Sequence, residues 1–151
     1  MAAIAIHLVV TDPDEAAAWY TRALGAVETS RLTLPDGNTL TIELRVGDTT
    51  VAVAGEFPAQ GMRTPAGLGG TPAAFHVQVP DVDTAWDRAI QAGATIFEPL
   101  HHAFWGDRTG QLLDPSGHRW ALDQHVSDVP ADEVARRAAE LFGAATTQQG
   151  E

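Results

Sequence analysis

The sequence predicts an α+β domain assembled from two βαβββ modules. Three observations favour this fold class: an internal repeat, a change from strand to helix periodicity within each copy, and a segment rich in glycine and proline between the copies. In the repeat, Ile6–Ala16 aligns without gaps on Phe75–Ala85, an offset of 69 residues. We expect one domain over residues 1–142, with module one at 1–56, a linker at 57–72, module two at 73–126 and a C-terminal helix at 130–142.

Each copy opens with a short strand that ends at an aspartate and leads into a helix. Apolar residues recur at helical spacing, at Ala16, Trp19, Tyr20 and Leu24 in the first copy and at Ala85, Trp86, Ala89 and Ile90 in the second. Asp12 and Asp81 stand where a side chain can accept hydrogen bonds from the first N–H groups of a helix. Gly25 and Gly93 can end the helices, because glycine adopts the left-handed cap conformation.

Three extended segments follow each predicted helix. In module one they cover 27–34, 39–46 and 49–54, with turns at 35–38 and 47–48 between them. In module two they cover 95–99, 110–113 and 118–125, with a longer loop at 101–109 and a turn at 114–117. Residues 143–151 are expected to form a flexible tail. The order strand, helix and three strands is thus predicted twice.

Composition and charge exclude several classes of function. The 151 residues are 44% hydrophobic, enough for one core, and the absence of cysteine excludes disulfides, thiolate zinc sites and a cysteine nucleophile. A formal charge of −11 disfavours nucleic acid and anionic membranes. The N-terminus lacks the basic start of a signal peptide, and no apolar segment approaches the roughly 20 residues that cross a bilayer. We expect a cytoplasmic protein whose partners are a small molecule and a second copy of itself.

Four short motifs add a likeness to a known family. They are Leu68-Gly69-Gly70-Thr71-Pro72, Phe104-Trp105-Gly106-Asp107-Arg108, Asp114-Pro115-Ser116-Gly117-His118-Arg119-Trp120 and His125-Val126-Ser127-Asp128-Val129-Pro130. With the repeated strand–Asp–helix opening, they resemble the PhnB-like branch of the vicinal oxygen chelate superfamily, which holds glyoxalases, bleomycin resistance proteins and dioxygenases. The resemblance covers about residues 4–142. It implies an incompletely closed, eight-stranded, barrel-like sheet around a small-molecule cavity, usually in a homodimer.

The resemblance also locates the positions that hold metal ligands in the metal-dependent relatives. Counting from the aspartates that end the opening strands gives Ala5 and Ala74, and counting from the 114–117 turn gives Ala121. The fourth position falls within 51–53. These apolar side chains cannot bind a metal, which disfavours glyoxalase-type isomerisation and iron-dependent ring cleavage at that site. We therefore expect no cofactor.

Three polar residues lie two positions beyond the vacated sites, at His7, His76 and Asp123, and residues two apart on a strand share a face. Two imidazoles and a carboxylate can form an open facial triad for a displaced divalent metal. Alternatively, His7 or His76 can act as an acid–base catalyst, because histidine titrates near neutral pH. In the third interpretation both histidines are neutral and hydrogen-bonded, and Asp123 is partly exposed. Glu43, on a predicted strand, is a further acid–base candidate.

Candidate ligand contacts come from the second module. Phe104 and Trp105 can stack on a planar ligand while Arg108 holds an oxyanion, or they can form a structural loop in which Asp107 and Arg108 pair. Trp120 and Asp123 complete this candidate set. We expect the adjacent His101 and His102 in a solvated loop and His118 at the surface, after the turn.

Two functions remain open. The first is a metal-independent protein that binds a small organic molecule, such as an antibiotic or another natural product, in a cavity lined by aromatic residues and histidines. The second is a lyase, isomerase or oxygenase that uses His7 or His76 as an acid–base group or as a metal ligand with Asp123. No glycine-rich phosphate loop opens a predicted helix, so nucleotide binding is disfavoured.

Overall fold

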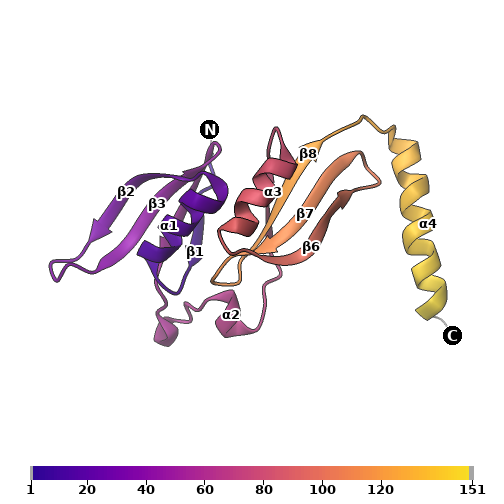
Figure 1. Ribbon diagram of the computed structural model, residues 1–151. Helices are drawn as coiled ribbons and strands as arrows, with labels where there is room; N and C mark the ends of the chain where they lie inside the picture. Colours follow the sequence, from indigo (N-terminus) through magenta and orange to yellow (C-terminus); the bar gives the residue numbers. More distant parts are fainter. Residues whose placement is uncertain (1, 150–151) are drawn as a thin grey trace.

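The computed structural model describes residues 2–149 and places the strands in two separate four-stranded sheets (Figure 1). Module one contains β1 (Ile6–Val9), α1 (Pro13–Leu24), β2 (Val27–Thr33), β3 (Thr39–Val46) and β4 (Thr49–Ala54), in the sheet order β1-β4-β3-β2. Module two contains β5 (Ala74–Gln78), α3 (Val82–Gln91), β6 (Thr95–His102), β7 (Asp107–Leu113) and β8 (Arg119–His125), in the order β5-β8-β7-β6. The predicted α+β fold of two βαβββ modules is confirmed.

In each module the opening strand pairs in parallel with the last strand, and the other pairings are antiparallel. Both sheets are therefore mixed, and neither closes into a barrel. The offset of 69 residues that relates β1 to β5 also relates β4 to β8, because His7 lies opposite Ala52 and His76 lies opposite Ala121. Each residue of the β1–β4 pair therefore has an equivalent in the β5–β8 pair.

The linker and the C-terminus contain more helix than the sequence predicted. A 3-10 turn (Pro58–Gln60) and the short helix α2 (Pro65–Leu68) lie between the modules. The C-terminal helix α4 (Ala131–Gln149) continues beyond residue 142, so the tail predicted at 143–151 is helical as far as Gln149, and its last two residues lie outside the described part. Figure 1 shows α4 standing apart from both sheets at one end of the molecule. No helix within residues 2–149 is long and apolar enough to span a membrane.

The predicted loop at 101–109 is mostly strand. β6 reaches His102 and β7 begins at Asp107, so only residues 103–106 turn, with Gly106 at a φ of 104°. Pro99 weakened the sequence signal, since proline has no N–H for a sheet. The sheet accommodates it because β6 is an edge strand whose register shifts between Glu98 and His101. The expectation of a solvated loop at His101 and His102 was therefore wrong.

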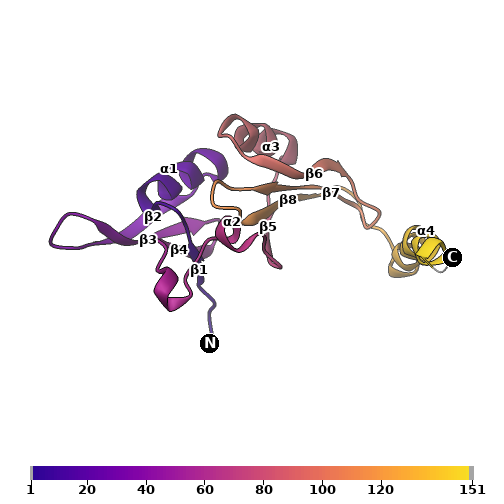
Figure 2. The same ribbon diagram turned by 90° about the horizontal axis from the view of Figure 1, so that it is seen from below.

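Helices α1 and α3 lie side by side on the same side of the two sheets (Figure 2). Trp19 Nε1 of α1 donates a 2.8 Å hydrogen bond to the carbonyl oxygen of Ala92, and Arg88 of α3 donates to the carbonyl oxygens of Thr21 and Arg22. One apolar core fills the space between helices and sheets. We call the side of each sheet that faces away from α1 and α3 the open face of that module (Figure 2).

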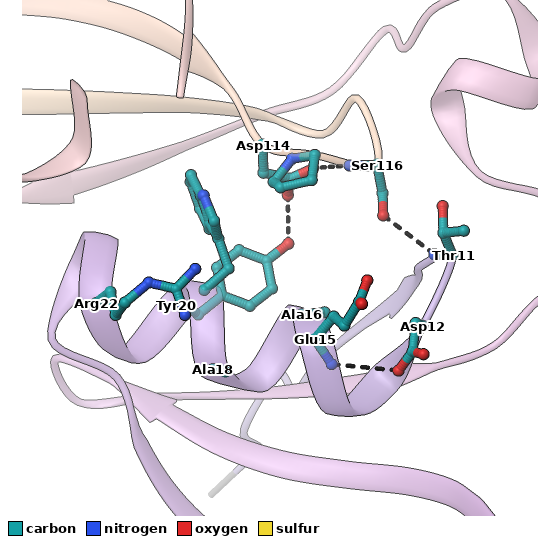
Figure 3. Close-up of a pocket in the computed structure, with 11 residues that line it drawn as sticks. Thr11, Asp12, Glu15, Ala16, Ala18, Tyr20, Arg22, Asp114 and Ser116 are labelled. Carbon is teal, nitrogen blue, oxygen red and sulfur yellow. Dashed lines mark hydrogen bonds between the residues drawn. The ribbon is translucent and has the colours of Figure 1, made fainter. Parts of the chain in front are cut away.

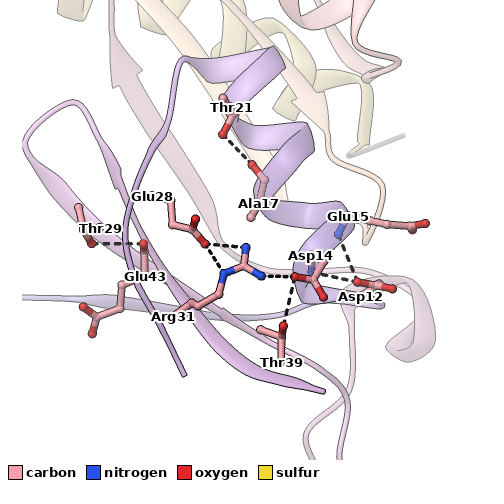
Figure 4. Close-up of polar contacts among 10 residues, drawn as sticks. All are labelled: Asp12, Asp14, Glu15, Ala17, Thr21, Glu28, Thr29, Arg31, Thr39 and Glu43. Atoms are coloured by element: carbon pink, nitrogen blue, oxygen red, sulfur yellow. Dashed lines mark hydrogen bonds and ion pairs between the residues drawn. The ribbon is translucent and has the colours of Figure 1, made fainter. Parts of the chain in front are cut away.

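The helix ends follow the sequence prediction. The Asp12 carboxylate accepts hydrogen bonds from the N–H groups of Asp14 and Glu15, and Asp81 accepts from Thr84, which lowers the pKa of Asp81. Figure 4 shows how Arg31 of β2 connects the start of α1 to the sheet through an ion pair with Asp14, while a second ion pair joins Arg31 to Glu28 within β2. These contacts fix α1 on the face opposite the open face.

The turn at 114–117 joins the modules (Figure 3). The buried Asp114 carboxylate accepts hydrogen bonds from Tyr20 Oη of module one, from Trp120 Nε1, and from the backbone N–H groups of Ser116 and His118. Burial, and then the neighbouring carboxylate, raise the pKa of Tyr20, so its phenol stays protonated.

His118 is buried, and Nε2 of its ring bonds the Val9 carbonyl oxygen at 2.8 Å. The expected surface position of His118 was therefore wrong, because the turn that precedes it is packed against the opposite module.

Candidate functional site

The strand register brings polar side chains together around Ala121 on the open face of module two. His76 of β5 lies beside Ala121 on one side, and Gln111 of β7 lies beside it on the other. One step along the same face, Asp123 lies between Gln78 and Thr109. Side chains directly opposite on paired strands point to the same side and are about 5 Å apart at Cβ. These two rows form the centre of the candidate site.

Asp123 is the most strongly held residue of this centre. It is 4% exposed, accepts from Nδ1 of His76 at 2.7 Å, and accepts a short hydrogen bond from Thr109 Oγ1. Gln78 Nε2 adds a longer contact of 3.4 Å. The expectation that Asp123 is partly exposed was therefore wrong, because its three partners surround it.

His76 presents its other ring nitrogen outward. Its side chain is 52% exposed, while Nδ1 is engaged by Asp123. When the imidazole is neutral, this hydrogen bond places the proton on Nδ1 and leaves the lone pair on Nε2. The pair can therefore accept a proton or a hydrogen bond from a molecule on the open face.

Module one lacks this pair. His7 is exposed and lies beside Ala52, and the position equivalent to Asp123 holds Ala54. Glu43 lies on the far side of Ala52, accepts from Ser30 Oγ at 3.1 Å, and directs its carboxylate away from α1 (Figure 4). His7 and Glu43 thus share an open face, without the buried carboxylate that orients His76.

The predicted metal positions carry only methyl groups. The register shows that the fourth position, expected within 51–53, is Ala52, because Ala52 and Ala121 have equivalent neighbours in the two modules. Ala5, Ala52, Ala74 and Ala121 offer no donor atom, so these residues do not fit the metal that the resemblance implies. Within residues 2–149 of one chain, no three His, Asp or Glu side chains form a group that could hold a metal ion.

A cavity of about 440 Å³ adjoins the pair at the junction of the modules. It is lined by His76 and Gln78 of module two, by Gly47 and Asp48 in the β3–β4 turn of module one, and by Thr49 at the start of β4. His7 lies outside it, in a smaller cavity of about 270 Å³ between β1 and the linker. A further cavity of about 370 Å³ lies on the helix side, beside the Tyr20–Asp114 contact (Figure 3). The structure thus separates His7 from the His76–Asp123 pair.

The predicted aromatic contacts lie at one end of module two. Phe104 and Trp105 pack edge to face at 4.9 Å in the 103–106 turn, and Trp105, 42% exposed, donates to Asp107. The alternative Asp107–Arg108 pair is not formed, because Arg108 turns to the helix side and pairs with Asp83 of α3 at 2.9 Å. The partner of Arg108 is thus in the protein. Trp120 is 3% exposed and belongs to the core, and it also lines the 440 Å³ cavity.

Two residues of the open face escaped the sequence prediction. Arg119 lies two residues before Ala121, on the same face, and Gln111 lies beside Ala121. The sequence could have indicated Arg119, because residues two apart on a strand share a face and Arg119 precedes Ala121 by two positions, just as Asp123 follows it. Gln111 carried no such signal, because its strand was predicted without a register.

The fold and site define a two-module protein with an open polar sheet face and alanines at the positions where metal ligands were expected. The chain belongs to the glyoxalase/bleomycin resistance protein/dioxygenase superfamily, whose pattern matches residues 3–122.

Among known proteins, the chain is 42% identical over 135 residues to uncharacterized proteins of Mycobacterium bovis and Mycobacterium tuberculosis, covering 87% of this chain and 89% and 79% of those proteins. Among solved structures it is similar to TioX from Micromonospora sp. ML1, with 28% identity, a TM-score of 0.63, and coverage of 85% of this chain and 100% of TioX. The fosfomycin resistance protein FosX from Listeria monocytogenes shares the fold, with 15% identity, a TM-score of 0.64, and coverage of 89% and 98%.

Proposed function

We propose that the protein is a metal-independent receptor of the PhnB-like branch that binds a small organic molecule, such as an antibiotic or another natural product, on its open face. The observation that carries the proposal is the row His76, Ala121 and Gln111. An alanine stands where the metal-dependent relatives place a carboxylate, and polar side chains on both sides can bond a ligand directly. The motifs at 68–72, 104–108 and 114–120 support the choice of branch.

We further propose that two copies form the working unit. Large apolar side chains are exposed on the outer strands β2 and β6, at Val27, Leu32 and Phe97. A second copy that faces these strands would bury them and cover the ligand site, as expected for a homodimer. Light scattering on the purified chain tests this, and a monomer at micromolar concentration would contradict it.

The receptor proposal is tested on protein treated with a chelator and checked by elemental analysis. A panel of natural products and small aromatic acids is screened by thermal shift, since a ligand that binds only the folded state raises the melting temperature. We expect at least one compound to stabilise the metal-free protein. Binding that appears only after zinc, manganese, nickel or ferrous iron is added would overturn the proposal.

A second candidate is catalysis by proton transfer, and the His76–Asp123 hydrogen bond favours it. A buried carboxylate that orients an exposed imidazole is the arrangement of a general base. The candidate activities are those of a lyase, an isomerase or an oxygenase. A bound compound that is recovered converted from the wild type, but unchanged from His76→Gln, would indicate catalysis. A compound recovered unchanged from both would leave binding as the function.

A further inference from the structure

Arg119 is a cation without a carboxylate on the open face of module two. Its strand neighbours are Ala74 on β5 and Leu113 on β7. The arginine side chains that form ion pairs within the described residues are those of Arg31, Arg108, Arg136 and Arg137. Five of the nine arginines form no ion pair within the described residues, and Arg119 is the one among them that lies on the open face of module two. The position of Arg119 therefore calls for a partner from outside the chain.

The side chain of Arg119 is held in place before any ligand arrives. Its Nε is buried and has no hydrogen-bond partner within residues 2–149, so part of the guanidinium is already shielded from water. Its Cζ lies 4.9 Å from the centre of the Phe97 ring, a cation–π contact. Phe97 is itself 54% exposed, so its ring can also touch a ligand. An anion meeting this guanidinium finds an oriented donor.

The neighbouring Gln111 supplies an acceptor. Its Oε1 is buried and likewise has no partner within the described residues. Gln111 lies beside Ala121 on the neighbouring strand. Arg119 precedes Ala121 by two positions on the same face, so the Cα atoms of Arg119 and Ala121 are about 7 Å apart. An unused donor and an unused acceptor thus flank one methyl group.

We propose that the Nη groups of Arg119 bind the carboxylate of an aromatic acid whose ring packs on Phe97 and whose hydroxyl group donates to Gln111 Oε1 once that amide turns outward. This inference rests on the proposed receptor function and names the class of its ligand. The guanidinium takes the place of a metal ion as the positive charge beside Ala121. Arginine fits the role because its planar fork bonds both oxygens of a carboxylate.

The test uses three probes on the full, chelator-treated chain: 3-hydroxybenzoate, whose hydroxyl cannot reach its own carboxylate, benzoate, and the uncharged benzamide. Binding is followed by NMR titration of the backbone amides. We expect 3-hydroxybenzoate to bind most tightly, to shift amides of β7 and β8, and to lose about tenfold or more in affinity in Arg119→Gln. The matched control is Arg22→Gln, which removes the same charge from α1 on the helix side and should change the affinity less than about twofold.

Each outcome bears on the inference. Gln111→Leu should bring 3-hydroxybenzoate down to the affinity of benzoate, because only the former has a hydroxyl for Oε1. Equal binding of benzamide and benzoate, or equal binding by Arg119→Gln and the wild type, would overturn the anion site. The receptor proposal would survive that result if uncharged compounds still bound the metal-free chain. Failure of all three probes to bind the wild type would also overturn the site.

Discussion

Ala54 and Asp123 occupy equivalent positions in the two modules, 69 residues apart, and differ in whether a histidine has a carboxylate partner. Both lie diagonally across a parallel strand pair from a histidine, His7 in one case and His76 in the other. Both positions are nearly inaccessible, at 2% and 4% exposure. The presence of alanine at one position and aspartate at the other therefore gives His7 and His76, which occupy equivalent positions in the repeat, different hydrogen-bond partners.

Asp123→Asn should change the tautomer of His76. The ionised carboxylate requires the ring proton on Nδ1, whereas an amide can donate to that nitrogen, so the population protonated at Nε2 should rise. Nitrogen and carbon NMR shifts of the imidazole at a pH where it is neutral measure the change. The signals of His7 are the internal control. An unchanged His76 tautomer would show that Asp123 does not set it.

Ala54→Asp should recreate the pair in module one. Thr41 lies opposite Ala54 as Thr109 lies opposite Asp123, so the new carboxylate would have a hydroxyl donor as well as His7. We expect the neutral His7 ring to gain the tautomer protonated at Nδ1, seen by the same NMR shifts. Ala54→Asn, of nearly equal size, is the control and should not produce this shift. If the two variants give the same His7 spectrum, a carboxylate at position 54 does not set the tautomer of His7.

Tyr20→Phe should weaken the contact between the modules. The change leaves the buried Asp114 carboxylate without the phenol donor, and an unsatisfied buried group costs about 1–3 kcal/mol. Urea unfolding measures the loss of stability. Thr21→Ala, on the exposed side of the same helix, is the matched control and should stay within about 0.5 kcal/mol of the wild type. Equal stability of all three proteins would mean that Asp114 is satisfied without Tyr20.

Gly110→Ala should disturb the packing of α3 on β7. A Cβ at Gly110 would lie 2.5 Å from Cζ3 of Trp86, which is well inside a van der Waals contact. We expect a loss of about 1–3 kcal/mol in urea unfolding, as for other overpacked cores. Gly55→Ala is the control, since its Cβ would meet nothing closer than 4.0 Å, and its stability should be unchanged or higher by up to about 1 kcal/mol. A Gly110→Ala protein of normal stability would imply that Trp86 can move freely.

His125 should make the connection between β8 and the C-terminal segment sensitive to pH. Hydrogen bonds to Asp128 and then to Asp107 raise the pKa of His125. The protonated ring favours the folded contacts, so their contribution is complete below the unfolded pKa of about 6.5 and is lost as the pH rises through the raised folded value.

Hydrogen exchange at the amides of residues 126–129 should therefore quicken with pH more steeply than the intrinsic rate. His125→Gln should follow the intrinsic rate alone, and a wild type that already does so would contradict the linkage.

The elements of module one could be predicted almost to the residue, whereas two parts of module two could not. The turns at 35–38 and 47–48 have strong local signals, and the predicted strands 39–46 and 49–54 agree with β3 and β4. The misplaced loop at 101–109 arose because Pro99 disrupts a local strand pattern, while only the sheet order reveals that β6 is an edge that tolerates it. The surface position expected for His118 failed for a similar reason, since packing against the other module is invisible in local sequence.

The sequence by itself determined the repeat, the two βαβββ modules and the helix caps, because each depends on residue type and short-range spacing. Only the tertiary structure decided that Asp123 bonds His76 and not His7, that Arg108 faces α3, and that Arg119 and Gln111 share a face with Ala121. Strand register and the packing of one module on the other set these contacts, and both depend on residues far apart in the chain.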